Sequence, residues 1–406
     1  MKRRGRAQKG QMELLEKMTD VFFELIRVAL GRKERLDRVL SDDEWRSVME
    51  LAMKQTLTGV AFTGVERLPA EERPPKEVLL RWYSMVSRTE AMNGRMDTLC
   101  ERLQERFLQD GLHSCILKGQ GVAAFHERPE RRVCGDIDIW VEGGRESLIK
   151  RYRGMFKEDV EVRFHHMDFP VMRETSVELH FFPSWMNSPL KNRRLQRWFA
   201  EQAERQMGHE VRLRGGERIY APTRGFNLVY VLLHIFRHLF EEGIGLRQIL
   251  DYYYISIIRN GQSPSVNQLH LEKGEQADHS SSGSDAGLGM REEDEARRVL
   301  KDLGLTRFAK ALMWVMGEVF GLEREAMLVE PDEKEGRYLL DEVMKAGNFG
   351  KYDPRFAHLQ EEKAWHIFVR KQRHIWRLLR HYPSETLWSP FFNIRQRLWR
   401  WRKGFL

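Results

Sequence analysis

Two stretches near the start of the chain carry apolar residues at three- and four-residue spacing, which is typical of amphipathic helices. These stretches are residues 10–30 and 91–110, and between them Ser41 and Glu44 form the capping-box pattern that begins a helix. The segment "LPAEERPP" predicts a connection before the second stretch, which ends at Gly111. We therefore expect a helical N-terminal region over residues 1–90.

After residue 113 the pattern changes to short apolar runs with alternation. The segment "HSCILKGQGVAAF" indicates a strand, a glycine turn and a helix. In "CGDIDIWVE", Ile137, Ile139 and Val141 alternate with Asp136 and Asp138, as in a half-buried strand. The segments "VRFHHMDFPV" and "SVELHFFPS" predict two more strands of the same sheet. We expect a mixed α/β unit over residues 91–215.

Helical periodicity returns from residue 216 onward. The run that ends in "GIGLRQILDYYYISII" predicts two helices joined at Gly243 and Gly245. Residues 261–292 are rich in Ser, Gly and charge, which predicts a flexible loop inside a helical region over 216–330. Residues 331–406 predict a C-terminal helical extension, with an aromatic and basic helix near 363–380 and a basic aromatic tail, "RLWRWRK".

Composition indicates a globular protein that is not exported. The chain has 406 residues, 41% of them hydrophobic, and no signal-peptide pattern. Its apolar runs fall short of the roughly 18 to 20 residues that span a bilayer. Three cysteines are too few for a disulfide framework, so we expect a cytoplasmic protein without a membrane span. The net charge of +8 favours polyanionic partners such as nucleotides, nucleic acid or acidic membranes, or reflects solvated basic tails.

Two aspartates one residue apart stand out in the apolar run. Because strand side chains alternate, Asp136 and Asp138 point to the same side, about 7 Å apart, and repel each other. Mg²⁺ relieves this repulsion because it prefers carboxylate oxygens and leaves positions for water and phosphate. A solvated strand face is the alternative. Gly135 before the pair and Glu178 in the later strand favour a metal site.

The carboxylates and the glycine turn together suit one kind of chemistry. Three carboxylates on adjacent strands can hold two metal ions for phosphoryl transfer. Gly119 lets backbone N–H groups at the following helix meet phosphate oxygens.

The segments "LKG", "RPERRVCGDIDIWV", "HHMDF" and "VELHF" resemble the uncharacterised nucleotidyltransferase family of the DNA polymerase β-like superfamily. The resemblance implies an α+β fold, with a polymerase β-like core of a small mixed sheet and helices, flanked by N- and C-terminal helical regions. It implies that Asp136 and Asp138 bind two Mg²⁺ ions, for which Mn²⁺ can substitute. Glu178 would hold the catalytic ion and help to activate the acceptor, and Gly119 would be the phosphate-turn glycine.

The chain departs from the family pattern after that glycine, where Gln120 replaces a common serine. Phosphate binding would then depend more on Lys118 and Arg132. The expected nucleotide-binding residues are Lys118, Gly119, Gln120, Arg132, Gly135 and His180.

Several of these residues have a plainer interpretation. Lys118 can be an exposed surface lysine, and Arg132 can clamp a triphosphate or pair with the aspartates. His180 lies on the same strand face as Glu178 and is a candidate substrate contact.

Other candidates are weaker. His165 and His166 are minor candidates for the site. His234 and His238, four residues apart, can chelate zinc, line the cleft or be structural. Arg247 with Asp251 suggests an ion pair within one helix, and Cys134 suggests core packing.

We therefore expect a Mg²⁺-dependent transfer of NMP from an NTP, with ATP as the expected donor, to an unknown hydroxyl or phosphate acceptor, with release of pyrophosphate. The acceptor can be a small molecule or a macromolecule. The alternative is a catalytically inactive nucleotide-binding or RNA/protein interaction module, in which Trp399 and Trp401 of the basic tail stack on nucleic-acid bases.

Overall fold

The structure is a computed structural model that describes residues 17–156, 160–171, 175–241, 243–258, 282–350 and 372–405. Short 3₁₀ turns connect several of its longer elements, at Ala70–Glu72, Pro129–Arg131, Arg153–Met155, Arg324–Ala326 and Asn348–Gly350.

Helices build the N-terminal part, as the sequence pattern predicts. A helix over 17–29 is followed by α2 (Asp42–Lys54), α3 (Thr58–Arg67) and α4 (Lys76–Gln109). The capping box at the start of α2 is confirmed, since Ser41 and Glu44 bond each other's backbone N–H groups. Helix α4 is longer than the pattern at 91–110 suggests and begins directly after Pro75.

A four-stranded sheet follows α4. Its strands are β1 (Ser114–Ile116), β2 (Ile137–Val141), β3 (His166–Asp168) and β4 (Val177–His180), in the order β1-β2-β4-β3. The β2 and β4 strands are parallel, whereas β1 and β3 run antiparallel to their neighbours, so the sheet is mixed as predicted. Short helices α5 (Gln120–Ala123) and α6 (Arg145–Tyr152) lie between strands. Helix α7 (Pro189–Met207) and a small hairpin of β5 (Glu210–Arg212) and β6 (Arg218–Tyr220) complete this part.

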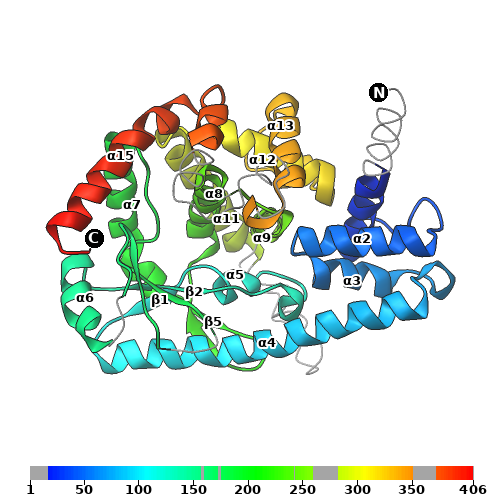
Figure 1. The fold of residues 1–406 in the computed structure, drawn as a ribbon, viewed down its shortest axis with the longest axis horizontal. Coiled ribbons are helices and arrows are strands. Elements are labelled where there is room, and N and C mark those ends of the chain that lie inside the picture. Colours follow the sequence, from blue (N-terminus) through cyan, green and yellow to red (C-terminus); the bar gives the residue numbers. More distant parts are fainter. Residues whose placement is uncertain are drawn as a thin grey trace, which may run out of the picture.

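Strand alternation gives the sheet two different faces. Ile137 and Ile139 share one apolar cluster with Leu103 and Phe107 of α4, which covers the first face. On the second face, Trp140 stacks on Phe226 of helix α8 (Arg224–Glu241), with ring centroids 6.2 Å apart. Figure 1 shows α4 along one side of the sheet and the later helices along the other. Asp138, which alternates with Ile137 and Ile139, therefore faces the later helices.

The later helices are α8 (Arg224–Glu241), α9 (Leu246–Ile257), α11 (Ser282–Asp302), α12 (Thr306–Phe320) and α13 (Glu333–Ala346). The first two are joined near Gly243 and Gly245, as predicted. The expected flexible loop over 261–292 is wrong at its C-terminal end, because α11 begins at Ser282. The remainder of that loop, residues 261–281, lies outside the described residues.

The basic C-terminal tail is a helix that contacts α6, although most of its basic side chains are exposed. Residues 372–378 are helical, and α15 (Pro383–Arg402) follows them. The guanidinium of Arg145 in α6 lies 4.3 Å from the ring centroid of Trp399, and Lys403 pairs with Glu146 at 2.8 Å. Figure 1 shows α15 at the periphery, with its C-terminal end beside α6. Residues 363–371, half of the aromatic-basic helix expected near 363–380, lie outside the described residues.

Among the described residues, no helix combines the length and the apolar character needed to cross a membrane.

Candidate active site

Three carboxylates converge on the second face of the sheet. Asp138 and Glu178 are direct partners in the parallel pairing of β2 with β4, and Asp136 lies one residue before β2. One oxygen of each of the three lies within 4.8 Å of one from each of the others. They line a cavity between the sheet and the helices α8 and α9. Asp138 is buried, whereas Asp136 and Glu178 are half-buried.

Lys118 neutralises the most buried of these carboxylates. Its Nζ lies 2.9 Å from Oδ1 of Asp138, and the lysine side chain is only 17% exposed, so it is not a plain surface lysine. Burial disfavours the ammonium form, but attraction to Asp138, Asp136 and Glu178 outweighs it and raises the pKa of Lys118. Burial likewise opposes the charged form of Asp138, but Lys118 and His180 together lower the pKa of that carboxyl.

His180 is a second internal cation at the site. Its Nε2 lies 2.8 Å from Oδ1 of Asp138 and 3.3 Å from Oε2 of Glu178. Burial disfavours the imidazolium form, yet hydrogen bonds to Asp138 and Glu178 raise the pKa of His180 to about 9. The chain thus places a lysine and a histidine against carboxylates that would otherwise repel each other.

The glycine turn lies at the same cavity, but the side chain of Gln120 points elsewhere. Gly119 has φ +53° and begins α5, a conformation that favours glycine. The N–H groups of Gly121 and Val122 donate within the turn to Lys118 and Gly119. Gln120 donates its amide N–H to Asp97 and lines a different cavity. Its expected nucleotide contact is therefore not available to its side chain.

Arg132 is held in a buried ion pair with the helical part. Its Nε and Nη2 donate to the two carboxylate oxygens of Asp251 at 2.7 and 2.8 Å, and His126 also contacts Asp251 at 2.9 Å. Arg132 therefore pairs neither with Asp136 nor with Asp138. The pairing of Arg247 with Asp251 suggested by their spacing is replaced, because Arg247 donates to the carbonyl of Val133 at 2.7 Å.

Arg247 is a cavity-lining cation that the sequence analysis assigned to a helix ion pair. Its Nη1 lies 3.9 Å from where a Cβ on Gly135 would be, which is an ordinary van der Waals separation, so the guanidinium lies beside the glycine. Its Nε is buried and has no hydrogen-bond partner among the described residues. Burial lowers the pKa of Arg247 to about 10.

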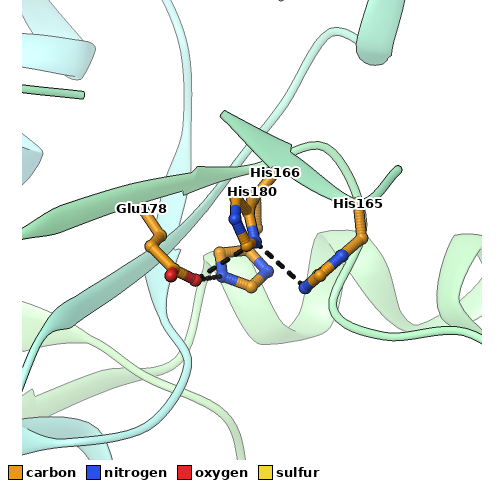
Figure 2. Close-up of side chains that lie close together, drawn as sticks. All are labelled: His165, His166, Glu178 and His180. Atoms are coloured by element: carbon orange, nitrogen blue, oxygen red, sulfur yellow. Dashed lines mark hydrogen bonds and ion pairs between the residues drawn. The ribbon is translucent and has the colours of Figure 1, made fainter. Parts of the chain in front are cut away.

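Two histidines that the sequence analysis treated as minor candidates join the site. His166 in β3 is the register partner of His180 in β4, and its Nδ1 lies 3.1 Å from Oε2 of Glu178. The Nδ1 of His166 also lies 3.0 Å from Nε2 of His165 (Figure 2). The signal in the sequence was the pair "HH" opposite "ELH", and it required the pairing of β3 with β4 to be known.

The remaining candidates lie in or near the cavity. His234 and His238 line it from α8, with ring centroids 4.3 Å apart, and burial lowers the pKa of both. They are not part of the groups of potential metal ligands found among the described residues. Cys134 is half-buried, packs at the edge of the apolar cluster on the α4 side, and has a pKa raised by burial.

The three carboxylates fit a divalent cation. Oδ2 of Asp138 is buried and has no hydrogen-bond partner among the described residues, although a buried carboxylate oxygen is normally bonded. Carboxylate oxygens are the ligands that hard divalent ions prefer. Asp136, Asp138 and Glu178 are therefore the residues that can hold such an ion.

The small mixed sheet, its helical flanks and the acidic cluster define a nucleotidyltransferase-like α+β protein. The chain belongs to the family described as uncharacterised nucleotidyltransferase, whose model matches residues 41–269, which confirms the resemblance inferred from the motifs.

One solved structure, an antigenic nucleotidyltransferase-like protein from Paracoccidioides brasiliensis, is similar at 13% identity over 52% of this chain and 92% of that one. Its TM-score of 0.27 is too low to support an argument. No curated protein matches the chain.

Proposed function

We propose that the protein transfers NMP from an NTP, with ATP as the expected donor, to a hydroxyl or phosphate acceptor and releases pyrophosphate in a Mg²⁺-dependent reaction. The observation that carries the proposal is the convergence of Asp136, Asp138 and Glu178 within 4.8 Å in a cavity that Lys118 and Gly119 also line. Membership of a nucleotidyltransferase family supports the reaction class.

The three acidic residues differ in burial, and we assign their roles accordingly. Bound Mg²⁺ would neutralise charge on the triphosphate and lower the pKa of an attacking hydroxyl. Asp138 is the buried ligand, whereas Asp136 and Glu178 are more accessible from the cavity. Oε2 of Glu178 lies 3.3 Å from Nε2 of His180 and 3.1 Å from Nδ1 of His166, and these contacts fix the position of its carboxylate.

Cations of the chain itself would bind the phosphates. Lys118 can move from Asp138 to a phosphate oxygen, because a metal ion would take over the neutralisation of Asp138. Arg247 takes the role first expected of Arg132, since Arg132 is held by Asp251 whereas Arg247 lines the cavity with an unsatisfied Nε. Gly119 and Gly135 leave the backbone accessible beside these cations.

The second candidate is a nucleotide-binding module without catalysis, and one observation favours it. Lys118 and His180 already contact Asp138, and His180 also contacts Glu178, so internal cations partly satisfy the carboxylates. Such a module would bind Mg²⁺ and NTP without releasing pyrophosphate. Pyrophosphate release over a broad panel of acceptors distinguishes the two candidates.

The test is NTP-dependent labelling by Asp136→Asn and Asp138→Asn variants. Removing one metal ligand should lower transfer by at least ~100-fold, by analogy with the loss of one group that stabilises transition-state charge. Glu142→Gln is the matched control, since Glu142 is an exposed carboxylate just beyond the other end of β2. Undiminished transfer by both aspartate variants, with the fold intact by circular dichroism, would exclude the proposal.

The acceptor is identified by a second experiment. A cell lysate is incubated with the protein, Mg²⁺ and isotopically labelled NTPs, and the products are analysed by mass spectrometry. A mass gain of one NMP, absent with Asp136→Asn, names both donor and acceptor.

A further inference from the structure

Four potential ligand atoms meet beside the acidic cluster, three of them from imidazoles. They come from His165, His166, His180 and Glu178, and one ligand atom of each lies within 4.8 Å of one from each of the others. Figure 2 shows the three rings and the carboxylate turned towards a common point. His166 and His180 are buried, and His165 lines the cavity from the residue before β3.

The spacing of these atoms matches a tetrahedral metal site. Metal–ligand distances of roughly 2.0 to 2.1 Å place tetrahedral ligands about 3.3 Å apart. The contacts here are 3.0 Å between His165 and His166, 3.1 Å between His166 and Glu178, and 3.3 Å between His180 and Glu178. Three of the six ligand–ligand distances thus match a tetrahedral ion, and the other three, all within 4.8 Å, would adjust on binding.

Hydrogen bonds alone do not satisfy this group. Nδ1 of His166 lies within hydrogen-bond distance of both His165 and Glu178, but one ring nitrogen carries at most one proton or one lone pair. Nε2 of His180 likewise faces two carboxylates with a single proton. A metal ion at the common point would displace the Nε2 proton of His180 and bind all four atoms at once.

The donor types select the class of ion. Neutral imidazole nitrogens are the commonest protein ligands of transition metals. Three imidazole nitrogens and one carboxylate oxygen suit borderline transition metals such as Zn²⁺, whereas Mg²⁺ prefers oxygen.

We propose that His165, His166, His180 and Glu178 form a site for a transition-metal ion such as Zn²⁺, separate in chemistry from the carboxylate site for Mg²⁺. The two sites share Glu178, while Asp136 belongs only to the carboxylate site. The proposal does not depend on nucleotide transfer, since it concerns metal binding by the full chain.

Binding of Co²⁺ and Zn²⁺ to the metal-stripped full-length protein tests this site. Co²⁺ in a tetrahedral nitrogen and oxygen environment absorbs visible light, and Zn²⁺ is followed by calorimetry. We expect one ion per chain with a tetrahedral Co²⁺ spectrum that Zn²⁺ abolishes and excess Mg²⁺ does not. The double variant His165→Ala/His166→Gln should bind at least tenfold more weakly, whereas Asp136→Asn and the exposed control His113→Gln should bind as the wild type does.

Three outcomes would overturn the metal site. The wild type could fail to bind Co²⁺ or Zn²⁺, or the double variant could bind them unchanged. Equal loss of binding in Asp136→Asn and in the double variant would place the ion at the carboxylates instead. Circular dichroism of each variant verifies that loss of binding is not loss of fold.

A second, independent observation concerns the outer face of α15. Large apolar residues recur along it at spacings of four, three, four and three, which places them on one stripe of the helix. Their exposed fractions lie between 50 and 69%, although such side chains are usually covered. We call these residues the apolar stripe: Leu387, Phe391, Ile394, Leu398 and Trp401.

Basic residues flank the apolar stripe on both sides. On the helix, Arg395 and Arg402 lie on one side of it and Arg397 on the other, and all three are exposed. No Asp or Glu occurs in residues 386–406. A second copy of this helix would therefore bring arginines against arginines, and three of the five stripe residues, Leu387, Ile394 and Leu398, offer no ring for base stacking. An anionic lipid surface fits both the apolar and the basic side chains.

We infer that α15 binds the surface of an anionic membrane, with the apolar stripe inserted at the headgroup boundary. Flotation of the full-length protein with vesicles tests this. We expect it to float with vesicles that contain phosphatidylglycerol and at least tenfold less with phosphatidylcholine alone. Phe391→Ser/Leu398→Ser should lose most of the binding, whereas the control Leu108→Ser/Leu190→Ser, at exposed apolar positions elsewhere, should keep it.

Two results would overturn the membrane proposal. The first is equal flotation of the wild type and Phe391→Ser/Leu398→Ser. The second is a wild-type dimer in buffer that becomes a monomer in this variant, because the stripe would then be covered by a second copy of the chain.

Discussion

Lys118 and Asp138 form a buried ion pair, with 2.9 Å between Nζ and Oδ1, at the centre of a group of three carboxylates. The lysine comes from the turn after β1, and the aspartate is the second residue of β2. The protein thus tolerates like charges on one strand face by supplying its own cation.

Replacing Lys118 should make the folding stability of the protein depend more strongly on a bound divalent ion. Removing one partner of a buried pair typically costs about 3 to 5 kcal/mol, so Lys118→Met should lower the free energy of unfolding by about 3 kcal/mol without metal. Mg²⁺ should restore more stability to Lys118→Met than it adds to the wild type. Urea unfolding with and without Mg²⁺ measures both effects, and the exposed Lys150→Met is the control. An unchanged unfolding midpoint in Lys118→Met would contradict this prediction.

The pair of Arg132 and Asp251 should show strong coupling. Both side chains are at most 7% exposed, so Arg132→Met or Asp251→Leu alone leaves a buried charge and should cost about 3 to 5 kcal/mol. The double variant should be less destabilised than the sum of the two single variants. A double-mutant cycle by urea unfolding gives the coupling free energy, and additive effects would show that the pair is not coupled.

Asp97 should make stability depend on pH. Burial raises the pKa of its carboxyl from an ordinary value of 3.8 to about 6. The hydrogen bond from Gln120 acts in the opposite direction but is the weaker effect. The folded chain therefore binds more protons than the unfolded chain between these values, and its stability falls as pH rises from about 4 to about 6.

Asp97→Asn should remove this loss and stabilise the protein at pH 7 by about 2 kcal/mol. The measurement is the difference in unfolding free energy between the wild type and Asp97→Asn from pH 4 to pH 7. A difference that does not change over this range would refute the assignment to Asp97.

The contact between Trp399 and Arg145 should hold the end of α15 on α6. Trp399→Ala removes the cation–π contact and the packing against Phe405, so exchange of amide hydrogens over the last turns of α15 should rise at least tenfold. Hydrogen exchange with mass spectrometry measures this, and Trp401→Ala, on the exposed stripe, is the matched control. Equal protection in both variants would mean that Trp399 does not anchor the helix.

The sequence alone predicted the features that depend on local patterns. Alternation around Asp138 predicted β2 and the face it presents, and spacing predicted α8, α9 and the break at Gly243. The carboxylates and Gly119 could be named because their chemistry is unusual in an apolar segment. These predictions did not require knowledge of the tertiary contacts between helices and strands.

The features of the site that the sequence did not predict depend on contacts between residues far apart in the chain. The partner of Arg132 lies 119 positions away, and nothing near Arg132 in the sequence distinguishes Asp251 from other acids. His166 became part of the site only through the register of β3 with β4. The charge of the tail suggests only exposure, so the contact of Trp399 with Arg145, over 250 positions earlier, could not be predicted from it.

The ion pair of Arg132 with Asp251 also bears on where the protein can be divided. Arg132 lies in the loop just before the aspartates, and Asp251 lies in α9, beyond the expected end of the α/β unit at residue 215. A fragment that ends there would leave Arg132 buried without its carboxylate and would lose the contact of Arg247 with Val133. The loop before Asp136 is thus held from outside the α/β unit, so a fragment that keeps this ion pair must extend through α9.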